Sequence, residues 1–178
     1  MALLRTRTLR GALAGGLAAG VWAAQQPLDK RVFGVDYDDA ELLGRFVAPG
    51  RAGYAAGLAL HVTNGALFGA LYAGVRPALP VPAVLRGPLA GLAEHLASWP
   101  VTALLPRVPA FEPLPALWGS WPAFAQATWS HLLFGTVLGE LERRLNPPEP
   151  EAEPMTAATA QTNGHGRAEH MASTPLTP

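Results

Sequence analysis

The sequence contains no cysteine and little charge, and both absences restrict its chemistry. Without cysteine the chain forms no disulfide, no thiolate metal site and no cysteine nucleophile. The 13 lysines and arginines balance the 13 aspartates and glutamates, so net charge is zero and no basic nucleic-acid-binding surface is indicated. Lys30 is the one lysine, a usage that indicates GC-rich and hence bacterial coding. Nucleophile-elbow, P-loop and dinucleotide-binding motifs are also missing.

Large apolar side chains are scarce after residue 146. Residues 147–178 consist mainly of Pro, Thr, Ala and Glu. Such a segment buries too little apolar surface to offset the entropy that it would lose on ordering. The sequence therefore predicts one folded domain over 1–146 and a disordered tail over 147–178.

Long Leu/Ile/Val runs of the kind that form a simple membrane anchor are also missing. Instead, four stretches rich in Ala and Gly carry few charges and approach the roughly 20 residues that a helix needs to cross a bilayer. The second and fourth fit this length best, the first is short, and the third is more polar. These predicted spans cover about 11–26, 54–75, 83–105 and 121–141.

Each predicted span contains two glycines four residues apart. Glycine costs about 1 kcal/mol relative to alanine inside a helix, and a soluble bundle favours larger side chains at its contacts. Membrane helices, in contrast, approach one another through small residues. The pattern favours an all-α, four-helix transmembrane bundle over a soluble Ala/Gly-rich bundle. The pairs are Gly11 and Gly15, Gly65 and Gly69, Gly87 and Gly91, and Gly135 and Gly139.

An internal repeat links the four stretches. RGALAG (10–15) matches RGPLAG (86–91), and HVTNGALFGALY (61–72) shares His-x3-Gly-x3-Gly with HLLFGTVLGELE (131–142). The matches predict two tandem helix–loop–helix units, at about 10–75 and 86–141. They also favour a retained first span over a secretory signal peptide cleaved after VWA (21–23).

Basic residues near the span ends predict the orientation. Seven flank the side that holds both termini and five flank the other side, which favours both termini in the cytoplasm of a cell-membrane protein. In the first loop, VDYDDAELLGRFV (35–47) predicts a short surface helix capped by Asp38 or Asp39. A calcium site on these acids is the alternative, but the EF-hand pattern fails at Ala40.

Polar residues inside the predicted spans form the candidate site. Helical residues four apart share a face, so each histidine lies on the glycine stripe of its helix and points into the bundle. At about 1.5 Å per residue, the three histidines share one layer of the membrane. The candidate residues are His61, Asn64, Glu94, His95 and His131.

Three interpretations of this set compete. In the first, neutral histidines hold helices together through hydrogen bonds. In the second, Glu94 and the three histidines relay protons or ions. In the third, a histidine pair holds haem or a metal ion, since neutral imidazole is a common ligand. No catalytic residue, no metal ligand and no obligatory cofactor is assigned.

The chain resembles small uncharacterised bacterial multi-pass membrane proteins. The resemblance rests on GALAGGLAAGVWAAQQPLDKRVFG (11–34), YDDAELLG (37–44) and the two His-x3-Gly-x3-Gly runs. It implies four membrane helices and transfers no active residues.

The expected function is therefore a non-catalytic membrane component that packs, or self-associates into a homo-oligomer, through its Gly-x3-Gly faces. Its expected partner is the lipid bilayer. The alternative is a small transporter or proton/ion conduit that uses Glu94, His61, His95 and His131. A haem- or metal-binding membrane protein is the third possibility.

Overall fold

The structure is a computed structural model, and it describes residues 2–111 and 114–147. Within these residues every regular element is helical. The α-helices are α1 (Ala2–Phe33), α2 (Asp39–Arg45), α3 (Gly50–Val75), α4 (Ala83–Ser98) and α5 (Trp121–Leu145), and the 3₁₀ helices are η1 (Arg76–Ala78), η2 (Trp99–Arg107) and η3 (Pro109–Phe111). Met1–Pro147 form one compact unit. The predicted disordered tail lies outside the described residues.

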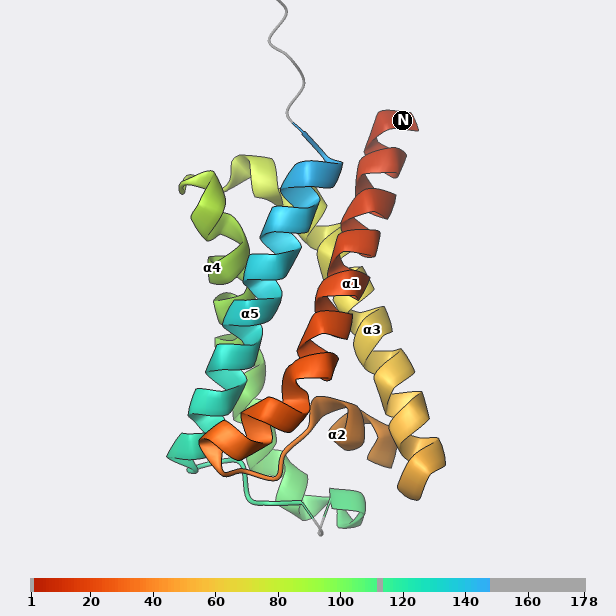
Figure 1. The fold of residues 1–178 in the computed structure, drawn as a ribbon, viewed down its shortest axis with the longest axis vertical. Coiled ribbons are helices and arrows are strands. Elements are labelled where there is room, and N and C mark those ends of the chain that lie inside the picture. The colour runs from red at the N-terminus through yellow and green to blue at the C-terminus, as the bar shows by residue number, and fades with distance from the viewer. Residues whose placement is uncertain (1, 112–113, 148–178) are drawn as a thin grey trace, which may run out of the picture. The chain divides into compact units, whose positions relative to one another are not determined.

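The four long helices run up and down in a bundle (Figure 1). The start of α1, the α3–α4 connection and the end of α5 lie together at what we call the terminal end. The short helix α2 and the 3₁₀ helices η2 and η3 lie at the opposite end, which we call the α2 end (Figure 1). This is the connectivity that two tandem helix–loop–helix units require.

The long helices contain the predicted spans, with two differences. Helix α1 is much longer than 11–26 and continues through Pro27. The α-helix that begins at Ala83 ends at Ser98 rather than near 105, and the chain continues as the 3₁₀ helix η2. Pro100 explains this end, because a proline disfavours the α conformation in the residue before it and lacks an N–H to bond backward.

Pro27 has a structural consequence for α1. Proline has no backbone N–H to donate to the carbonyl of the preceding turn. Helix α1 changes direction near its C-terminal end (Figure 1). Two polar residues beside the proline, Gln26 and Asp29, are each only 2% exposed. The end of α1 therefore brings amide and carboxylate groups into the bundle.

Glycines set the closest helix contacts. A Cβ on Gly15 of α1 would overlap the carbonyl of Gly65 on α3, and one on Gly69 would overlap the carbonyl of Gly11. In the second pair, a Cβ on Gly87 of α4 would overlap the carbonyl of Gly135 on α5. Gly91 and Gly139 also lie at this α4–α5 contact. The two helix pairs are thus built on the same contact, as a repeat would give.

Helix α2 confirms the prediction of a short capped helix in the first loop. The Oδ1 atom of Asp38 accepts from the backbone N–H groups of Ala40 and Glu41, at 2.9 and 3.1 Å. Helix α2 then packs on α3, where Gly44 meets Gly53 and Gly57 at backbone distance. The contact fixes α2 beside the first turns of α3.

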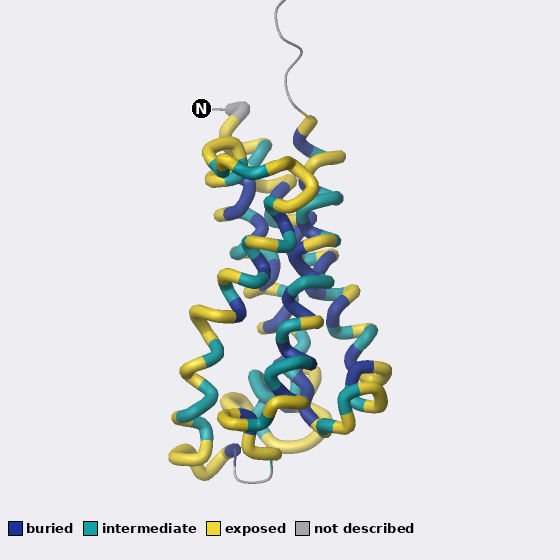
Figure 2. The backbone as a smooth tube through the Cα atoms, turned by 90° about the vertical axis from the view of Figure 1, so that its left-hand side faces the viewer, coloured by how far each residue is buried: buried dark blue, intermediate teal, exposed yellow. Residues whose placement is uncertain are grey.

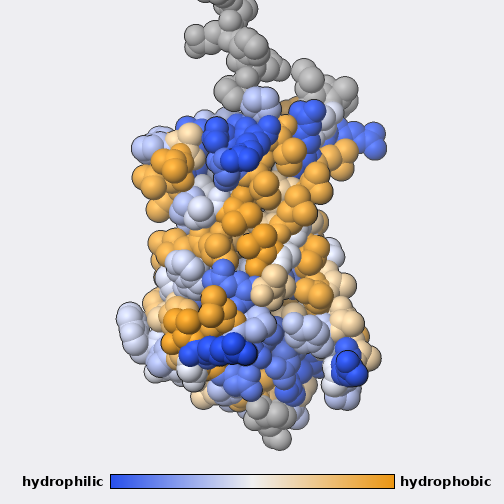
Figure 3. Space-filling view, in the orientation of Figure 1, coloured by the Kyte–Doolittle hydropathy of each residue, from blue (hydrophilic) through white to orange (hydrophobic). Residues whose placement is uncertain are grey.

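Burial is inverted relative to an ordinary soluble bundle. Small and polar residues make up much of the interior, together with a few large side chains such as Leu138 and Phe134, whereas many leucines of α1, α3 and α4 are exposed. Figure 2 shows exposed positions recurring along the length of the bundle. Apolar side chains cover much of the middle of the face in Figure 3, with hydrophilic ones gathered near both ends. By length and hydropathy together, one described stretch, Gly50–Ala78, is long and apolar enough to cross a membrane.

Candidate functional site

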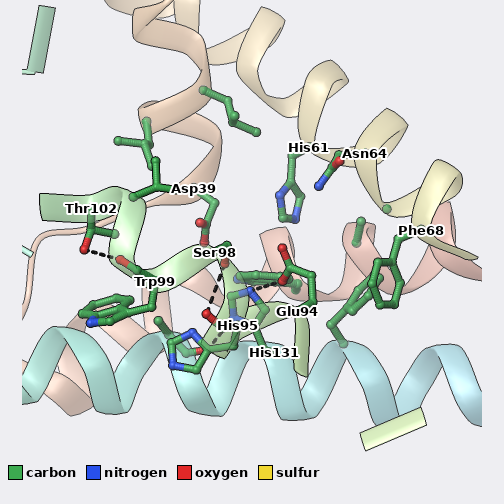
Figure 4. A pocket seen from close by; sticks show the side chains of 18 of the residues that line it. Asp39, His61, Asn64, Phe68, Glu94, His95, Ser98, Trp99, Thr102 and His131 are labelled. Carbon is green, nitrogen blue, oxygen red and sulfur yellow. Dashed lines mark hydrogen bonds and ion pairs between the residues drawn. The ribbon is translucent and has the colours of Figure 1, made fainter. Parts of the chain in front are cut away.

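A cavity of about 260 Å³ lies inside the α2 half of the bundle. Helices α1, α2, α3, α4 and α5 and the 3₁₀ helix η2 all contribute to its wall (Figure 4). The structure brings all five residues of the candidate site to this one cavity. They are His61, Asn64, Glu94, His95 and His131.

Glu94 and His131 form a hydrogen-bonded pair on the cavity wall. The Nε2 atom of His131 lies 2.6 Å from Oε2 of Glu94. Its Nδ1 atom lies 2.7 Å from the carbonyl of Ala127, one turn earlier on α5. Because a carbonyl only accepts, Nδ1 carries a proton, and one further proton is shared between Nε2 and the carboxyl group. The pair is a site where a proton is held between an acid and a base.

His95 is buried in a different setting, between α4 and α5. The hydroxyl of Thr128 donates to the carbonyl of Phe124 at 2.8 Å. The Nε2 atom of His95 lies 3.0 Å from the same hydroxyl oxygen, whose single hydrogen is already used. Nε2–H is therefore the donor, and the lone pair lies on Nδ1, which is buried without a partner among the described residues.

His61 faces the cavity from α3, on the wall opposite α5 (Figure 4). The side chain is 6% exposed, and its Nε2 atom is buried with no hydrogen-bond partner in the described part of the chain. Trp22 of α1 lies between two imidazoles, with ring centroids 4.8 Å from His61 and 4.6 Å from His131. The rings of His95 and His131 are 4.8 Å apart. The histidines thus form one row across the bundle.

Asp39 lines the cavity at its α2 end, whereas the sequence placed it as a helix cap or, in the alternative, as a calcium ligand. Its Oδ1 accepts from the hydroxyl of Tyr37 at 2.5 Å, and its Oδ2 accepts from the amide of Gln26 at 2.9 Å. Burial raises the pKa of Asp39, while the Tyr37 hydrogen bond and the nearby His61 and His131 act in the opposite direction. The pKa of Tyr37 is also raised, mainly by burial.

A chain of polar groups continues from Asp39 into the interface between α1 and α5. Gln126 is fully buried, and its amide nitrogen lies 3.1 Å from the carbonyl of Tyr37 and 3.4 Å from the side-chain oxygen of Gln26. Ser130 donates to Asp29 at 3.3 Å. The sequence could have indicated Gln126 and Ser130, because these two polar residues lie four positions apart and therefore share one face of an otherwise apolar helix.

Apolar packing closes the cavity toward the terminal end of the bundle. Phe134 lines the cavity, and the fully buried Leu138 lies one turn beyond it on α5. Ala14, Ala18 and Tyr72 complete this apolar cluster. An apolar layer therefore separates the cavity from the terminal end of the bundle.

A second polar cluster lies beyond that layer, at the terminal end. Arg76 forms an ion pair with Glu142, whose side chain is fully buried. Arg76 also donates to the carbonyl of Asn146 at 3.2 Å, and the amide of Asn146 donates to the carbonyl of Arg7 at 3.2 Å. This cluster ties together α1, the end of α3 and the end of α5. It is separate from the cavity.

Within the described part of the chain, no three histidine or acidic side chains are grouped so as to hold a metal ion. Comparison with known proteins gives no relative: no family model, curated protein or solved structure matches this sequence.

Proposed function

We propose that the chain is a multi-pass protein of the cell membrane, whose four long helices span the bilayer with both termini in the cytoplasm. The observation that supports this most is the inversion of burial. Leu17, Leu67 and Leu89, for example, are 50%, 61% and 45% exposed, while Ala18 and His95 are at most 1% exposed. A soluble bundle would bury the leucines, because each exposed apolar side chain forfeits about 1.5–3 kcal/mol.

A bilayer removes that cost, since the leucines then face hydrocarbon. Only 28% of the apolar window in Gly50–Ala78 is buried, so most of this window faces outward, as a lipid-facing surface does. In hydrocarbon, polar groups must find partners inside the protein. The hydrogen bonds of His131 to its own helix and of Gln126 to α1, and the ion pair of Glu142 with η1, fit that requirement.

The role that fits this geometry is a non-catalytic membrane component built around a polar cavity. The glycine faces are occupied by neighbouring helices of the same chain. A homo-oligomer would therefore form through the outer, leucine-bearing surfaces rather than through Gly-x3-Gly contacts.

The absence of native cysteine allows a direct test of membrane topology. Ala78→Cys, in the α3–α4 connection, and Ala110→Cys, in η3, place single thiols at opposite ends of the bundle. We expect a membrane-impermeant maleimide to label Ala110→Cys in intact spheroplasts and Ala78→Cys only after lysis. Recovery of the wild-type protein in the soluble fraction without detergent would overturn the proposal.

An absorbance spectrum of the purified protein tests the haem interpretation.

A proton or ion conduit is the second candidate, and the Glu94–His131 pair is the observation that favours it. Intramembrane acid and histidine groups commonly mark proton paths. Because Phe134 and Leu138 close the terminal side, passage requires that this apolar layer open. Proton flux into liposomes containing wild type should exceed that of Glu94→Gln, whereas the surface variant Glu140→Gln should match wild type. Equal flux in wild-type and empty liposomes would exclude the conduit.

A further inference from the structure

The cavity wall has buried polar atoms that the described residues do not pair. The Nε2 atom of His61 is buried without a partner among them, and the ring points into the cavity (Figure 4). Glu94 uses Oε2 for His131, while its other oxygen, Oε1, has no partner among the same residues and its side chain remains 34% exposed. Buried polar atoms are normally paired, so unpaired ones facing a cavity indicate where a ligand would bind.

The charged residues that line the cavity indicate the charge of a ligand that would bind there. Two carboxyl groups, those of Asp39 and Glu94, are among the described residues that line the cavity, and none of these residues is Lys or Arg. His131 offsets at most one of the two carboxylates. An anion would thus meet acidic groups and no permanent positive charge, whereas a cation would find the second carboxylate oxygen of Glu94.

Aromatic rings supply the rest of the wall. Trp22, Phe68 and Trp99 line the cavity together with Tyr37 and Phe134. A cation within about 6 Å of such a ring centre is attracted to the ring face, and the attraction is stronger where water is excluded. The same rings offer an apolar surface to a short hydrocarbon group. The volume of about 260 Å³ limits the ligand to a small molecule.

From this combination we propose that the cavity binds a small organic ammonium ion that carries N–H groups. The N–H groups donate to Oε1 of Glu94 and to Nε2 of His61, whose ring then carries its own proton on Nδ1. The alkyl part packs against Trp22 and Phe68. Access is from the α2 end, because Phe134 and Leu138 close the other side. The inference deepens the proposed function and rests on it, since it assumes the membrane-embedded bundle.

The internal repeat explains why His61 is available. His131 and His61 occupy equivalent positions, 70 residues apart, but Glu94 corresponds at the offset of 76 to Ala18 of α1. The first unit therefore has no carboxylate at the position equivalent to Glu94. Among the described residues, Nε2 of His61 remains free for a ligand, while Nε2 of His131 is bound to Glu94.

The test uses the full chain purified in detergent, with n-butylammonium as the probe. n-Butanol and butyrate keep the alkyl group and remove the charge or reverse it, and tetramethylammonium keeps the charge and removes the N–H groups. We expect saturable binding of n-butylammonium by calorimetry, weaker binding of tetramethylammonium, and no saturable binding of n-butanol or butyrate. Equal binding of n-butylammonium and tetramethylammonium would overturn the role of the N–H groups.

Variants then locate the site. Glu94→Gln keeps the shape of the side chain and should weaken n-butylammonium binding about tenfold or more, since a charge-assisted hydrogen bond is lost. Glu140→Gln, on the outer surface of α5, should leave the affinity unchanged. Equal affinity of wild type and Glu94→Gln, or no binding by wild type, would overturn the inference. If cysteine labelling still shows the expected topology, only the ligand assignment fails; recovery of a soluble protein would instead overturn the proposed function itself.

Discussion

Nε2 of His131 lies 2.6 Å from Oε2 of Glu94, and this contact joins α5 to α4 across the cavity. The two residues are 37 positions apart in the sequence and come from the two helices of one repeat unit. Their pairing leaves Oε1 of Glu94 facing the cavity. The acid thus both anchors His131 and contributes to the open site.

Replacement of Glu94 by leucine should destabilise the protein more than replacement by glutamine. Nδ1 of His131 donates to the carbonyl of Ala127, so in a neutral imidazole Nε2 accepts. Glutamine can donate an amide N–H to Nε2, whereas leucine leaves this buried acceptor unpaired, at a cost of about 1–3 kcal/mol. Thermal unfolding in detergent would measure the difference. A leucine variant as stable as the glutamine variant would show that this hydrogen bond contributes little to stability.

Glycine substitutions in α1 should have opposite effects at two positions. A Cβ on Gly15 would overlap the carbonyl of Gly65, and overpacking of this kind costs about 1–3 kcal/mol. A Cβ on Gly20 would meet no atom of the described residues within 4 Å, so Gly20→Ala should stabilise the helix by up to about 1 kcal/mol. Chemical unfolding of both variants tests the contact, and a neutral Gly15→Ala would contradict it.

The free energy of unfolding should depend on pH through Asp39. Because burial raises its pKa in the folded state, folding favours the protonated acid. The resulting stabilisation is fully present below the unfolded-state pKa and is lost as pH rises through the higher folded-state pKa. Wild type should therefore lose stability relative to Asp39→Asn over this interval. A constant difference between the two proteins would mean that the pKa of Asp39 is the same in both states.

The ion pair at the terminal end should contribute more to the free energy of unfolding than an ion pair on the surface. Glu142→Leu leaves Arg76 buried without its carboxylate and should cost about 3–5 kcal/mol. Glu140→Leu breaks pairs with Arg143 and Arg144 on exposed side chains and should change the free energy of unfolding far less, because solvent screens these charges.

The double variant Arg76→Met/Glu142→Leu tests the same pair in another way. It removes both charges and should regain most of the stability that Glu142→Leu loses. If the double variant is as unstable as Glu142→Leu, the loss of stability comes from the missing side chain of Glu142 and not from the unpaired charge of Arg76.

Local patterns in the sequence were enough to place the long helices, the short helix after Asp38 and the glycine contacts. Helix starts follow from capping groups and prolines, and a four-residue spacing places side chains on one helix face wherever the helix lies. The same spacing directed His61, His95 and His131 inward. The end of α4 at Ser98 was missed, although Pro100 is a local signal for it.

Tertiary structure alone decided which polar groups meet. Asp39 lines the cavity because α2 packs on α3, and Gln26 reaches Asp39 because α1 bends near Pro27. Both placements depend on contacts between segments that are far apart in the sequence, and no repeating pattern in the sequence predicts such contacts. The sequence by itself determined that inward faces would be small and polar. The packing of α4 on α5 determined that Glu94 would bind His131, and the placement of α3 left Nε2 of His61 without a partner among the described residues, because hydrogen bonding requires positions accurate to a fraction of an ångström.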